Sequence, residues 1–326
     1  MDDIRKVLII GGAGYLGSVL SEACIDEGYS VTVYDSLQFG SAGLESLKTQ
    51  PGFCLIQGDV RNFAHLTSAI IGKDAVIMLA AVVGAPLCKQ NPKDAIDINY
   101  LVTNAVADCC VYYGVRRFIF ASSDSIYGQI DGSVDEQSEP NPISLYGILK
   151  RRVEEEVSKK ATGSFCPTFL RMATLFGLSP RMRFELIVNF LAMNAALYGK
   201  VTAFNGAQYR PLVHVRDAAQ AYVRVLGSPE QLVRNKIYNV GDSKQNLRMC
   251  ELAELVKETV PGLELAYTSE TNDYRSYFIE CEKIKEIGFQ VKYDVKYGIT
   301  EIYGAVKSRL YGGCSDEIYY NYHMGQ

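Results

Sequence analysis

The sequence predicts an α/β fold in which a doubly wound parallel sheet is joined to a smaller mixed α/β lobe. Three observations predict it. Short apolar runs alternate with helical segments through the first half of the chain, and a glycine-rich turn directly follows the first run. After about residue 175 this regular rhythm gives way to shorter, less regular segments. Continuous apolar runs separated by helices are typical of parallel strands buried on both faces.

The expected strands of the first half are rich in Val, Ile and Phe. They comprise residues 6–10, 30–35, 53–59, 74–81 and 117–123. A helix is expected from about Tyr15 to Glu27, with Gly28 as its C-cap. Within residues 92–113, an apolar stripe at helical spacing fits either core packing or a helix-bundle dimer interface. The stripe consists of Ala95, Ile98, Val102, Ala105, Val106 and Cys109.

The pattern changes after Gly128. Residues 130–142 are polar and contain two prolines, which predicts a surface loop. A charged helix is expected to start near Ser144, and residues 165–177 form a strand that leads into a loop. The remainder mixes a short strand, helices and a polar, tyrosine-rich tail. These segments are residues 236–241, 247–260, 296–310 and 311–326.

Composition excludes several classes of partner. The 326 residues carry a net charge of −4, so no basic surface for nucleic acid is expected. Nine cysteines without a CxxC pair fit buried free thiols of a reducing compartment, and three scattered histidines do not predict a metal site. The N-terminus is too short and too acidic for a signal peptide, and no run approaches the ~18 apolar residues of a membrane span. We therefore expect a cytoplasmic protein without a membrane partner.

The turn GGAGYLG places glycines at positions 11, 12, 14 and 17. Such glycines allow a tight turn and let the backbone approach a pyrophosphate, which then lies at the N-terminus of the following helix. The turn follows an apolar strand and opens a helix, so it predicts a Rossmann dinucleotide site. The NAD-binding domain is expected at residues 1–175, with segments returning near 205–245, and the substrate lobe and tail at 176–326.

Two carboxylates follow later strands of this domain. Asp35 ends the second strand, where a carboxylate accepts hydrogen bonds from the adenosine ribose and repels a 2′-phosphate, so NAD is favoured over NADP. Asp59 ends the third strand and is a candidate contact to the adenine amino group. For both residues, ordinary turn chemistry is the alternative interpretation.

Tyr146 and Lys150 form a YxxxK pair on one helix face. A tyrosine acts as a base only after losing its proton, and a nearby ammonium favours the phenolate. The motif is short, and Tyr303 with Lys307 is a second match. Only Tyr146 follows a strand that ends in a serine, Ser123, so we favour the first pair.

Five motifs, taken together and in this order, resemble the extended short-chain dehydrogenase/reductases that act on nucleotide sugars. They are GGAGYLG (11–17), GDV (58–60), SSDSIYG (122–128), YGILK (146–150) and PLVHVRDAA (211–219). The resemblance covers nearly the whole chain. It implies a sheet of about seven strands, bound NAD, a C-terminal substrate lobe and hydride removal from a sugar carbon, usually C4.

The resemblance also implies residue roles. Ser123 orients the sugar hydroxyl, Tyr146 is the base, Lys150 is its partner, and Asn99 has a structural or water-relay role. The expected cofactor contacts are Gly11, Gly14, Tyr15, Leu16, Gly17, Asp35, Asp59, Val60, Leu79, Ala80, Ala81, Tyr146 and Lys150. The expected substrate contacts are Val83, Gly84, Asp124, Ser125, Thr174, Arg181, Arg183, Arg210 and Arg275. Arginines suit the two phosphates of a nucleotide sugar, although a solvated surface role is the alternative for each.

Departures from the family pattern narrow the chemistry. Ser125 stands where the family's 4,6-dehydratases carry a glutamate, which argues against dehydration, and Thr174 stands where many members have an asparagine. Residues 79–92 and 179–186 resemble a subgroup that oxidises C4 of a GDP-linked heptose, although the first segment can also be only a packed loop.

The expected function is therefore C4 oxidation of a GDP- or UDP-linked sugar, as a 4-epimerase or a 4-dehydrogenase. An NADH-dependent 4-keto-sugar reductase and a non-catalytic NAD-binding regulator are the alternatives. A homodimer is expected to form through the helices near 92–113 and 144–160.

Overall fold

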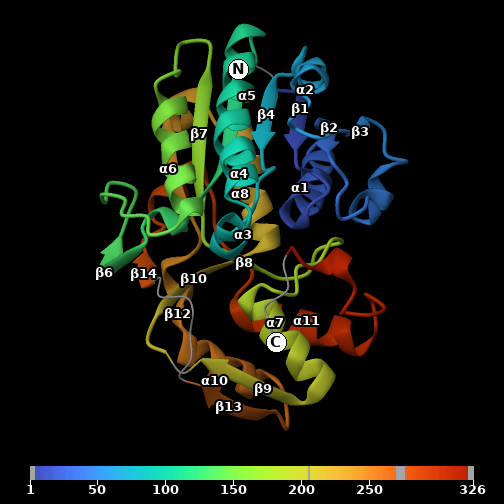
Figure 1. The fold of residues 1–326 in the computed structure, drawn as a ribbon, viewed down its shortest axis with the longest axis vertical. Helices are drawn as coiled ribbons and strands as arrows, with labels where there is room; N and C mark the ends of the chain where they lie inside the picture. The colour runs from blue at the N-terminus through green and yellow to red at the C-terminus, as the bar shows by residue number, and fades with distance from the viewer. Residues whose placement is uncertain (1–3, 205, 269–275, 322–326) are drawn as a thin grey trace.

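The computed structural model describes residues 4–204, 206–268 and 276–321. Its main feature is a seven-stranded, all-parallel sheet in the order β11-β7-β5-β4-β1-β2-β3 (Figure 1). The strands are β1 (Lys6–Ile10), β2 (Ser30–Asp35), β3 (Phe53–Gln57), β4 (Ala75–Met78), β5 (Arg117–Ser123), β7 (Cys166–Met172) and β11 (Lys236–Val240). The predicted doubly wound sheet is confirmed.

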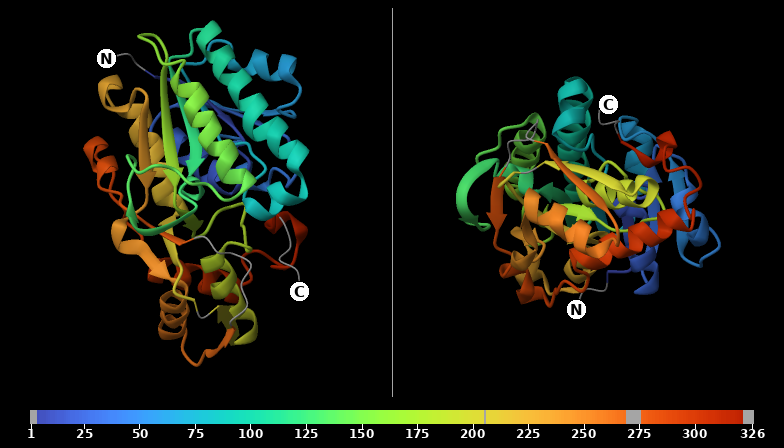
Figure 2. Two further views of the ribbon diagram at one scale, coloured as in Figure 1. Left: turned by 60° about the vertical axis from the view of Figure 1, so that its left-hand side comes forward. Right: turned by 90° about the horizontal axis from the view of Figure 1, so that it is seen from below.

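Helices cover both faces of this sheet because its strands bury side chains on both. Val7 and Ile9 of β1 contribute to the core on one face, and Leu8 and Ile10 to the core on the other. The first face is covered by α1 (Tyr15–Asp26) and α8 (Val215–Gly227). The second is covered by α2 (Phe63–Ile70), α5 (Thr103–Tyr112) and α6 (Leu145–Ser158), of which α6 is the light green helix of Figure 2.

Shorter helices connect these elements. Between β4 and α5 lie α3 (Ala85–Gln90), α4 (Pro92–Ile96) and a π-helical turn, η2 (Asp97–Val102). The helix α9 (Glu230–Val233) precedes β11, and short 3₁₀ turns occupy Ala42–Leu47, Asp124–Ile126, Ser243–Gln245, Lys283–Ile287 and Glu317–Tyr319. The sequence therefore predicted the 92–113 region correctly as helical but did not reveal its interruption by a π turn.

The second lobe lies below the main sheet in Figure 1 and contains three small sheets. Its strands are β8 (Thr174–Phe176), β10 (Tyr209–His214) and β12 (Asn246–Arg248) in one sheet, β9 (Lys200–Phe204) with β13 (Glu264–Thr268), and β6 (Gln129–Val134) with β14 (Ser276–Ile279). Its helices are α7 (Ile187–Tyr198), α10 (Met249–Thr259) and α11 (Val295–Lys307).

Two predictions about local structure were wrong. The expected loop at 130–142 begins with β6, which pairs with the distant β14. Residues 165–177 begin with the expected strand, β7, but the part expected to be a loop contains a second strand, because the chain leaves the main sheet after Met172 and continues as β8 beside β10.

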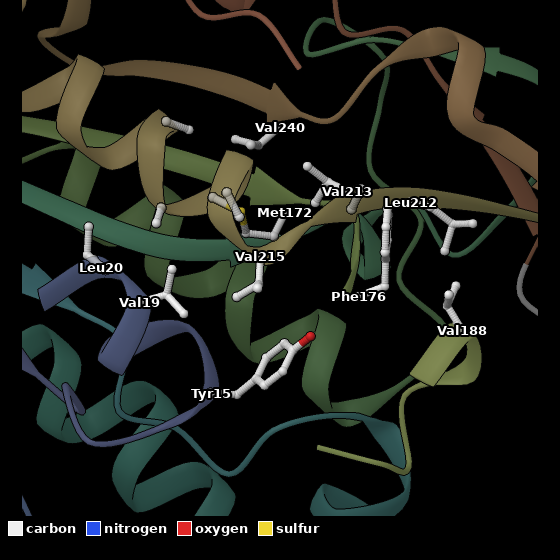
Figure 3. Close-up of a cluster of buried hydrophobic side chains, with 14 of the residues drawn as sticks. Tyr15, Val19, Leu20, Met172, Phe176, Val188, Leu212, Val213, Val215 and Val240 are labelled. Atoms are coloured by element: carbon white, nitrogen blue, oxygen red, sulfur yellow. The ribbon is translucent and has the colours of Figure 1, made fainter. Parts of the chain in front are cut away.

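One continuous apolar core joins the two lobes. In Figure 3, Tyr15, Val19 and Leu20 of α1 lie close to a cluster that includes residues of β8, α7, β10 and β11. The C-terminal tail packs against the second lobe, where Tyr311, Tyr319 and Tyr320 surround the ring of Phe184. Within the described ranges, every helix falls short of the length and apolar character that a membrane span requires.

Candidate active site

In the glycine turn between β1 and α1, neighbouring backbone segments lie so close together that side chains would not fit. Gly11 has a φ of +90°, and a β-carbon there would lie 2.6 Å from the backbone nitrogen of Ala80. A β-carbon on Gly17 would lie 2.3 Å from the carbonyl oxygen of Gly11, so only glycine lets α1 pack against the turn. Leu79 and Ala80 both donate N–H hydrogen bonds to the carbonyl of Ile10, which holds residues 79–81 against the turn.

The side chain of Tyr15 lies inside the protein. Its hydroxyl donates to the carbonyl of Gly177 at 2.6 Å and accepts from Asn189 at 3.2 Å. It therefore links the first turn of α1 to the second lobe, and only its backbone faces the glycine turn. Gly14 is the N-cap of the same helix, and Leu16 follows in its first turn.

The two predicted carboxylates differ in environment. Asp35 accepts N–H hydrogen bonds from Ala13 and Leu37 at 2.9 Å each, which fixes it beside the glycine turn. Burial raises the pKa of Asp35, while those two donors and the charge of Arg181 act in the opposite direction. Asp59 instead forms a solvent-exposed pair with Arg61, with Oδ2–Nη2 at 2.6 Å, and its neighbour Val60 is buried.

Ser123 ends β5 and caps the turn that follows it. Its hydroxyl accepts from the N–H of Ser125 at 3.1 Å and donates to the carboxylate of Asp124 at 3.2 Å. All three side chains are buried. A β-carbon on Gly147 would lie 2.6 Å from the carbonyl of Ser125, so this glycine allows α6 to lie against the turn.

The helix α6 brings Tyr146 and Lys150 to Ser123. Ser144 caps the helix by accepting from the N–H of Gly147 at 3.2 Å. The ammonium of Lys150 donates to the carbonyl of Ala121 at 2.6 Å and lies 5.4 Å from the centre of the Tyr146 ring. The expected Ser123, Tyr146 and Lys150 therefore gather at the carboxyl end of β5.

Burial governs the ionisation of this group. It raises the pKa of Tyr146 well above its ordinary value, and the buried thiol of Cys88 acts in the same direction. The charge of Arg183 and the side-chain hydrogen bond between Tyr146 and Ser123 lower it. Burial also lowers the pKa of Lys150 to about 8, against the effects of Cys88 and Glu154. The tyrosine thus depends on nearby positive charge to become a base.

A rigid loop after β4 forms one wall around Tyr146. The amide of Asn99, in the π-helical turn, accepts from the N–H of Val82 at 2.8 Å and donates to its carbonyl at 2.9 Å. Val82, Val83 and Cys88 pack with Tyr146 in one apolar cluster. Gly84 follows with a φ of +89°, a conformation that favours glycine. Asn99 thus holds in place the loop that packs against Tyr146.

Both arginines of the segment 179–186 are buried rather than solvated. Arg183 pairs with Glu185 at 2.7 Å, and its carbonyl accepts from Asn189 at 2.9 Å. The guanidinium carbon of Arg181 lies 4.0 Å from the centre of the Phe39 ring, in the loop after β2. The surface alternative for these two residues is therefore wrong.

The remaining predicted substrate residues lie on the small sheet. Thr174 opens β8, and Arg210 lies in β10 with its Nη1 2.9 Å from the carbonyl of Tyr209. Arg275 lies outside the described residues. A hollow of about 480 Å³ between β6, β10 and β14 contains none of the predicted site residues. The alternative pair Tyr303 and Lys307 lies on α11, where Lys307 is exposed.

Sequence reasoning missed a buried network behind the site. Glu154, one turn after Lys150, accepts from Ser122 at 2.5 Å and from Arg171 at 2.7 Å. Arg171 also donates to Tyr127 at 3.0 Å, which donates to Asn239 at 2.7 Å. The network ties α6 to β5, β7 and β11. A charged Arg inside an otherwise apolar strand, CPTFLRM, was the signal that could have revealed it.

The parallel sheet carries a glycine turn and a buried Ser–Tyr–Lys group at its carboxyl edge. This combination is typical of enzymes that oxidise or reduce a substrate with a nicotinamide dinucleotide. Residues 7–241 match the model of the NAD dependent epimerase/dehydratase family, and the chain belongs to that family. It is therefore an NAD-dependent enzyme with a Rossmann fold.

Three similar proteins illustrate the range of this family. The chain is 25% identical to the UDP-glucose 4-epimerase of Corynebacterium glutamicum, over 94% of this chain and 96% of that one. It is 26% identical to the dTDP-D-glucose 4,6-dehydratase of Mus musculus, over 91% and 87%. The solved structure of MoeE5 in complex with UDP-glucuronic acid and NAD is 27% identical and superposes with a TM-score of 0.79, covering 93% of this chain and 99% of that one.

Proposed function

We propose that the protein oxidises C4 of a nucleotide-diphosphate sugar and acts as a 4-epimerase or a 4-dehydrogenase through a 4-keto intermediate. The observation that carries the proposal is the convergence of Ser123, Tyr146 and Lys150 at the carboxyl end of β5, in a protein of this family. Residues 1–175 and the segments returning near 205–245 hold the cofactor in this proposal, and residues 176–326 hold the substrate.

The chemistry follows from the residues. NAD, when bound, supplies the hydride acceptor. Tyr146 takes the proton of the C4 hydroxyl, and Ser123 orients that hydroxyl by hydrogen bonding. The positive charges of Lys150 and Arg183 favour the phenolate that accepts the proton. When the ketone turns and is reduced on its other face, Tyr146 returns the proton and the product is the C4 epimer; when the ketone leaves, the reaction is a dehydrogenation.

The residues around this group argue against dehydration. A 4,6-dehydratase needs a base at C5 and an acid at C6 in addition to the C4 chemistry. Ser125 stands two positions after Ser123 and offers a hydroxyl, which is a poor base near neutral pH. Asp124, which accepts a hydrogen bond from Ser123, is a candidate for the acid, but position 125 holds a serine and not a carboxylate. We therefore place the chain with the epimerases rather than the dehydratases of its family.

A UDP-linked sugar is the first substrate to test, because the epimerase relative is named for one and MoeE5 binds one. A GDP-linked heptose oxidised at C4 is the second candidate. The sequence resemblance of residues 79–92 and 179–186 to enzymes with that substrate supports it, and Val82 and Val83 of the first segment pack in one apolar cluster with Tyr146. The proposed substrate contacts are Val83, Gly84, Asp124, Ser125, Thr174, Arg181, Arg183, Arg210 and Arg275, of which Arg275 lies outside the described residues.

The test is to mix the purified protein with UDP- and GDP-linked hexoses and heptoses, then follow nicotinamide absorbance and product mass. A product two mass units lighter with lasting reduced cofactor identifies a dehydrogenase, and an isomer of unchanged mass identifies an epimerase. Turnover only with a 4-keto sugar and NADH would support the reductase instead.

The variant Tyr146→Phe separates the enzyme from a non-catalytic regulator. Removal of the phenolic oxygen is expected to lower kcat by roughly 10² to 10⁴, the range typical of a lost general acid–base group. NAD affinity, measured by calorimetry, should stay within about twofold. A variant with unchanged turnover would contradict the proposed base.

We further propose a cytoplasmic homodimer that buries the apolar residues left exposed on two neighbouring helical regions. Ile96, Leu101 and Val111 are exposed near α4 and α5, and Ile148 is exposed on the adjoining α6. Helices of this kind bury exposed apolar stripes by packing into a bundle.

A further inference from the structure

The buried guanidinium of Arg181 lies over the ring of Phe39, in the loop that follows β2. From this arrangement we infer that Arg181 binds an oxygen of the adenosine half of NAD, at the ribose or its adjoining phosphate. The inference rests on NAD binding, which belongs to the family, and not on the identity of the sugar. It moves Arg181 from the expected substrate contacts to the cofactor contacts.

The segment that carries Arg181 is anchored on the first turn of α1. The hydroxyl of Ser179 donates to the carbonyl of Tyr15 at 2.7 Å and lies 3.0 Å from the hydroxyl of Ser18. The N–H of Arg181 donates to the same Ser179 hydroxyl at 3.3 Å. Because the N-terminal turn of such a helix receives the pyrophosphate of a dinucleotide, Arg181 is held within the cofactor-binding edge of the sheet.

The side chain of Arg181 then extends over the loop that follows β2. Its Cβ lies 3.3 Å from the position that a β-carbon on Gly43 would take, and its guanidinium covers the ring of Phe39. This loop starts at Asp35, and the charge of Arg181 acts to lower the pKa of the Asp35 carboxyl. A carboxylate at the end of the second strand is the ribose contact of a dinucleotide site. Arg181 is thus beside the residue expected to mark the adenosine ribose.

The guanidinium of Arg181 has N–H donors available for a ligand. Only 4% of Arg181 is exposed, and its Nε and Nη2 atoms have no hydrogen-bond partner among the described residues. Burial and the charge of Arg183 lower its pKa to about 10, so the buried cation gains from an anionic or hydroxyl-rich ligand. A nucleotide phosphate or ribose offers the oxygens that these donors need.

Arg183 lies two residues later, and its charge acts on Arg181 as well. Its charge acts on Tyr146, whereas that of Arg181 acts on Asp35. The short segment that carries the two arginines therefore influences both the predicted ribose carboxylate and the predicted base. This division gives the two arginines different ligands, and it makes the inference testable with partial ligands.

The experiment measures dissociation constants by calorimetry for ADP-ribose, which carries the adenosine half without nicotinamide, and for UDP-glucose. It compares wild type with Arg181→Met and with Arg224→Met, an exposed arginine on α8. We expect Arg181→Met to weaken ADP-ribose binding by roughly ten- to a hundredfold, the effect of losing a charge-assisted hydrogen bond. UDP-glucose binding and the Arg224→Met variant should change by less than about threefold.

A second variant protects the test against misfolding. Phe39→Leu leaves Arg181 intact but removes the ring beneath the guanidinium, and it should weaken ADP-ribose binding by a fewfold. Measuring the affinities of wild type and Arg181→Met for NAD and for NADP shows which oxygen Arg181 contacts. If the contact is at the ribose, Arg181→Met changes the preference between NAD and NADP. If the contact is at the phosphate, Arg181→Met weakens the binding of NAD and of NADP equally. Unchanged ADP-ribose affinity in Arg181→Met, or a loss confined to UDP-glucose, would overturn the inference. Failure of the wild type to bind ADP-ribose would count against the cofactor assignment itself.

Discussion

At the scale of single residues, the site combines ionisable groups with an apolar, buried setting. Lys150 is 3% exposed and is surrounded by Phe120, Tyr146 and the carbonyl of Ala121. An ammonium in such surroundings is destabilised relative to water, and its charge is kept because the reaction uses it. The residue is therefore placed for function at a cost to stability.

The pH dependence of unfolding should reveal that cost. In the folded protein the pKa of Lys150 is lowered from 10.5 to about 8. Between these two values the unfolded chain holds a proton that the folded protein has lost, so the contribution of Lys150 to stability rises with pH across this window. Relative to Lys150→Met, the wild type should gain at most about 3 kcal/mol between pH 8 and 10.5.

Urea unfolding of both proteins in the absence of ligand, repeated from pH 7 to 10.5, gives this difference. Lys159→Met, which alters an exposed lysine at the end of the same helix, is the control and should show no comparable gain. A difference between wild type and Lys150→Met that stays flat with pH would show that Lys150 is not destabilised by burial.

At the scale of elements, α6 is the support of the reacting groups. Glu154 of this helix forms a buried ion pair with Arg171, in which each side chain is only about 5% exposed, and accepts a hydrogen bond from Ser122. Removing one member of a buried pair leaves the other charge without compensation. The network thus holds the catalytic helix against the end of β5.

Glu154→Ala should therefore lower the free energy of unfolding by about 3–5 kcal/mol. Glu156→Ala, on the same helix but paired with exposed Lys159, should leave it almost unchanged. Chemical denaturation followed by circular dichroism measures both. Equal effects of the two substitutions would mean that the buried network contributes nothing specific.

The elements also show what the sequence could predict. Strands such as Lys6–Ile10 were identifiable because burial on both faces produces an uninterrupted apolar run. The strand β6, with the sequence QIDGSV, gave no such signal because it has no continuous apolar run, and its partner β14 lies far along the chain. The glycine turn and the YxxxK helix were identifiable because their chemistry is local.

Contacts made by the tertiary fold could not be predicted in the same way. The burial of Arg181 depends on Phe39, and that of Arg183 on Glu185 within a folded segment. Two arginines separated by one residue, as in SPRMRF, look the same in a sequence whether they face solvent or a cofactor. For the same reason the sequence could not divide these two residues between the ends of the site.

At the scale of the whole molecule, the helices that support the site also carry an exposed apolar surface. Leu101 is 53% exposed and Ile148 is 41% exposed, on η2 and α6, which contact each other. Burial of this surface in a homodimer would place the interface directly behind Tyr146.

Leu101→Lys should weaken the dimer by adding a charge at its centre, by at least about tenfold in dissociation constant. Leu197→Lys, at an exposed leucine on α7 in the second lobe, is the matched control. Sedimentation equilibrium over a range of concentrations measures both. A wild type that is monomeric at every concentration, or a dimer untouched by Leu101→Lys, would contradict the proposed interface.

The edge strand β11 has a consequence for how the chain is made. It pairs with β7, yet about 60 residues of the second lobe and of α8 and α9 lie between them. During synthesis, β7 leaves the ribosome long before its partner and has an unpaired edge until then. Until β11 has been synthesised, the apolar strand β7 is open to pairing with other chains. A chaperone that protects the nascent protein is expected to act between the synthesis of β7 and that of β11.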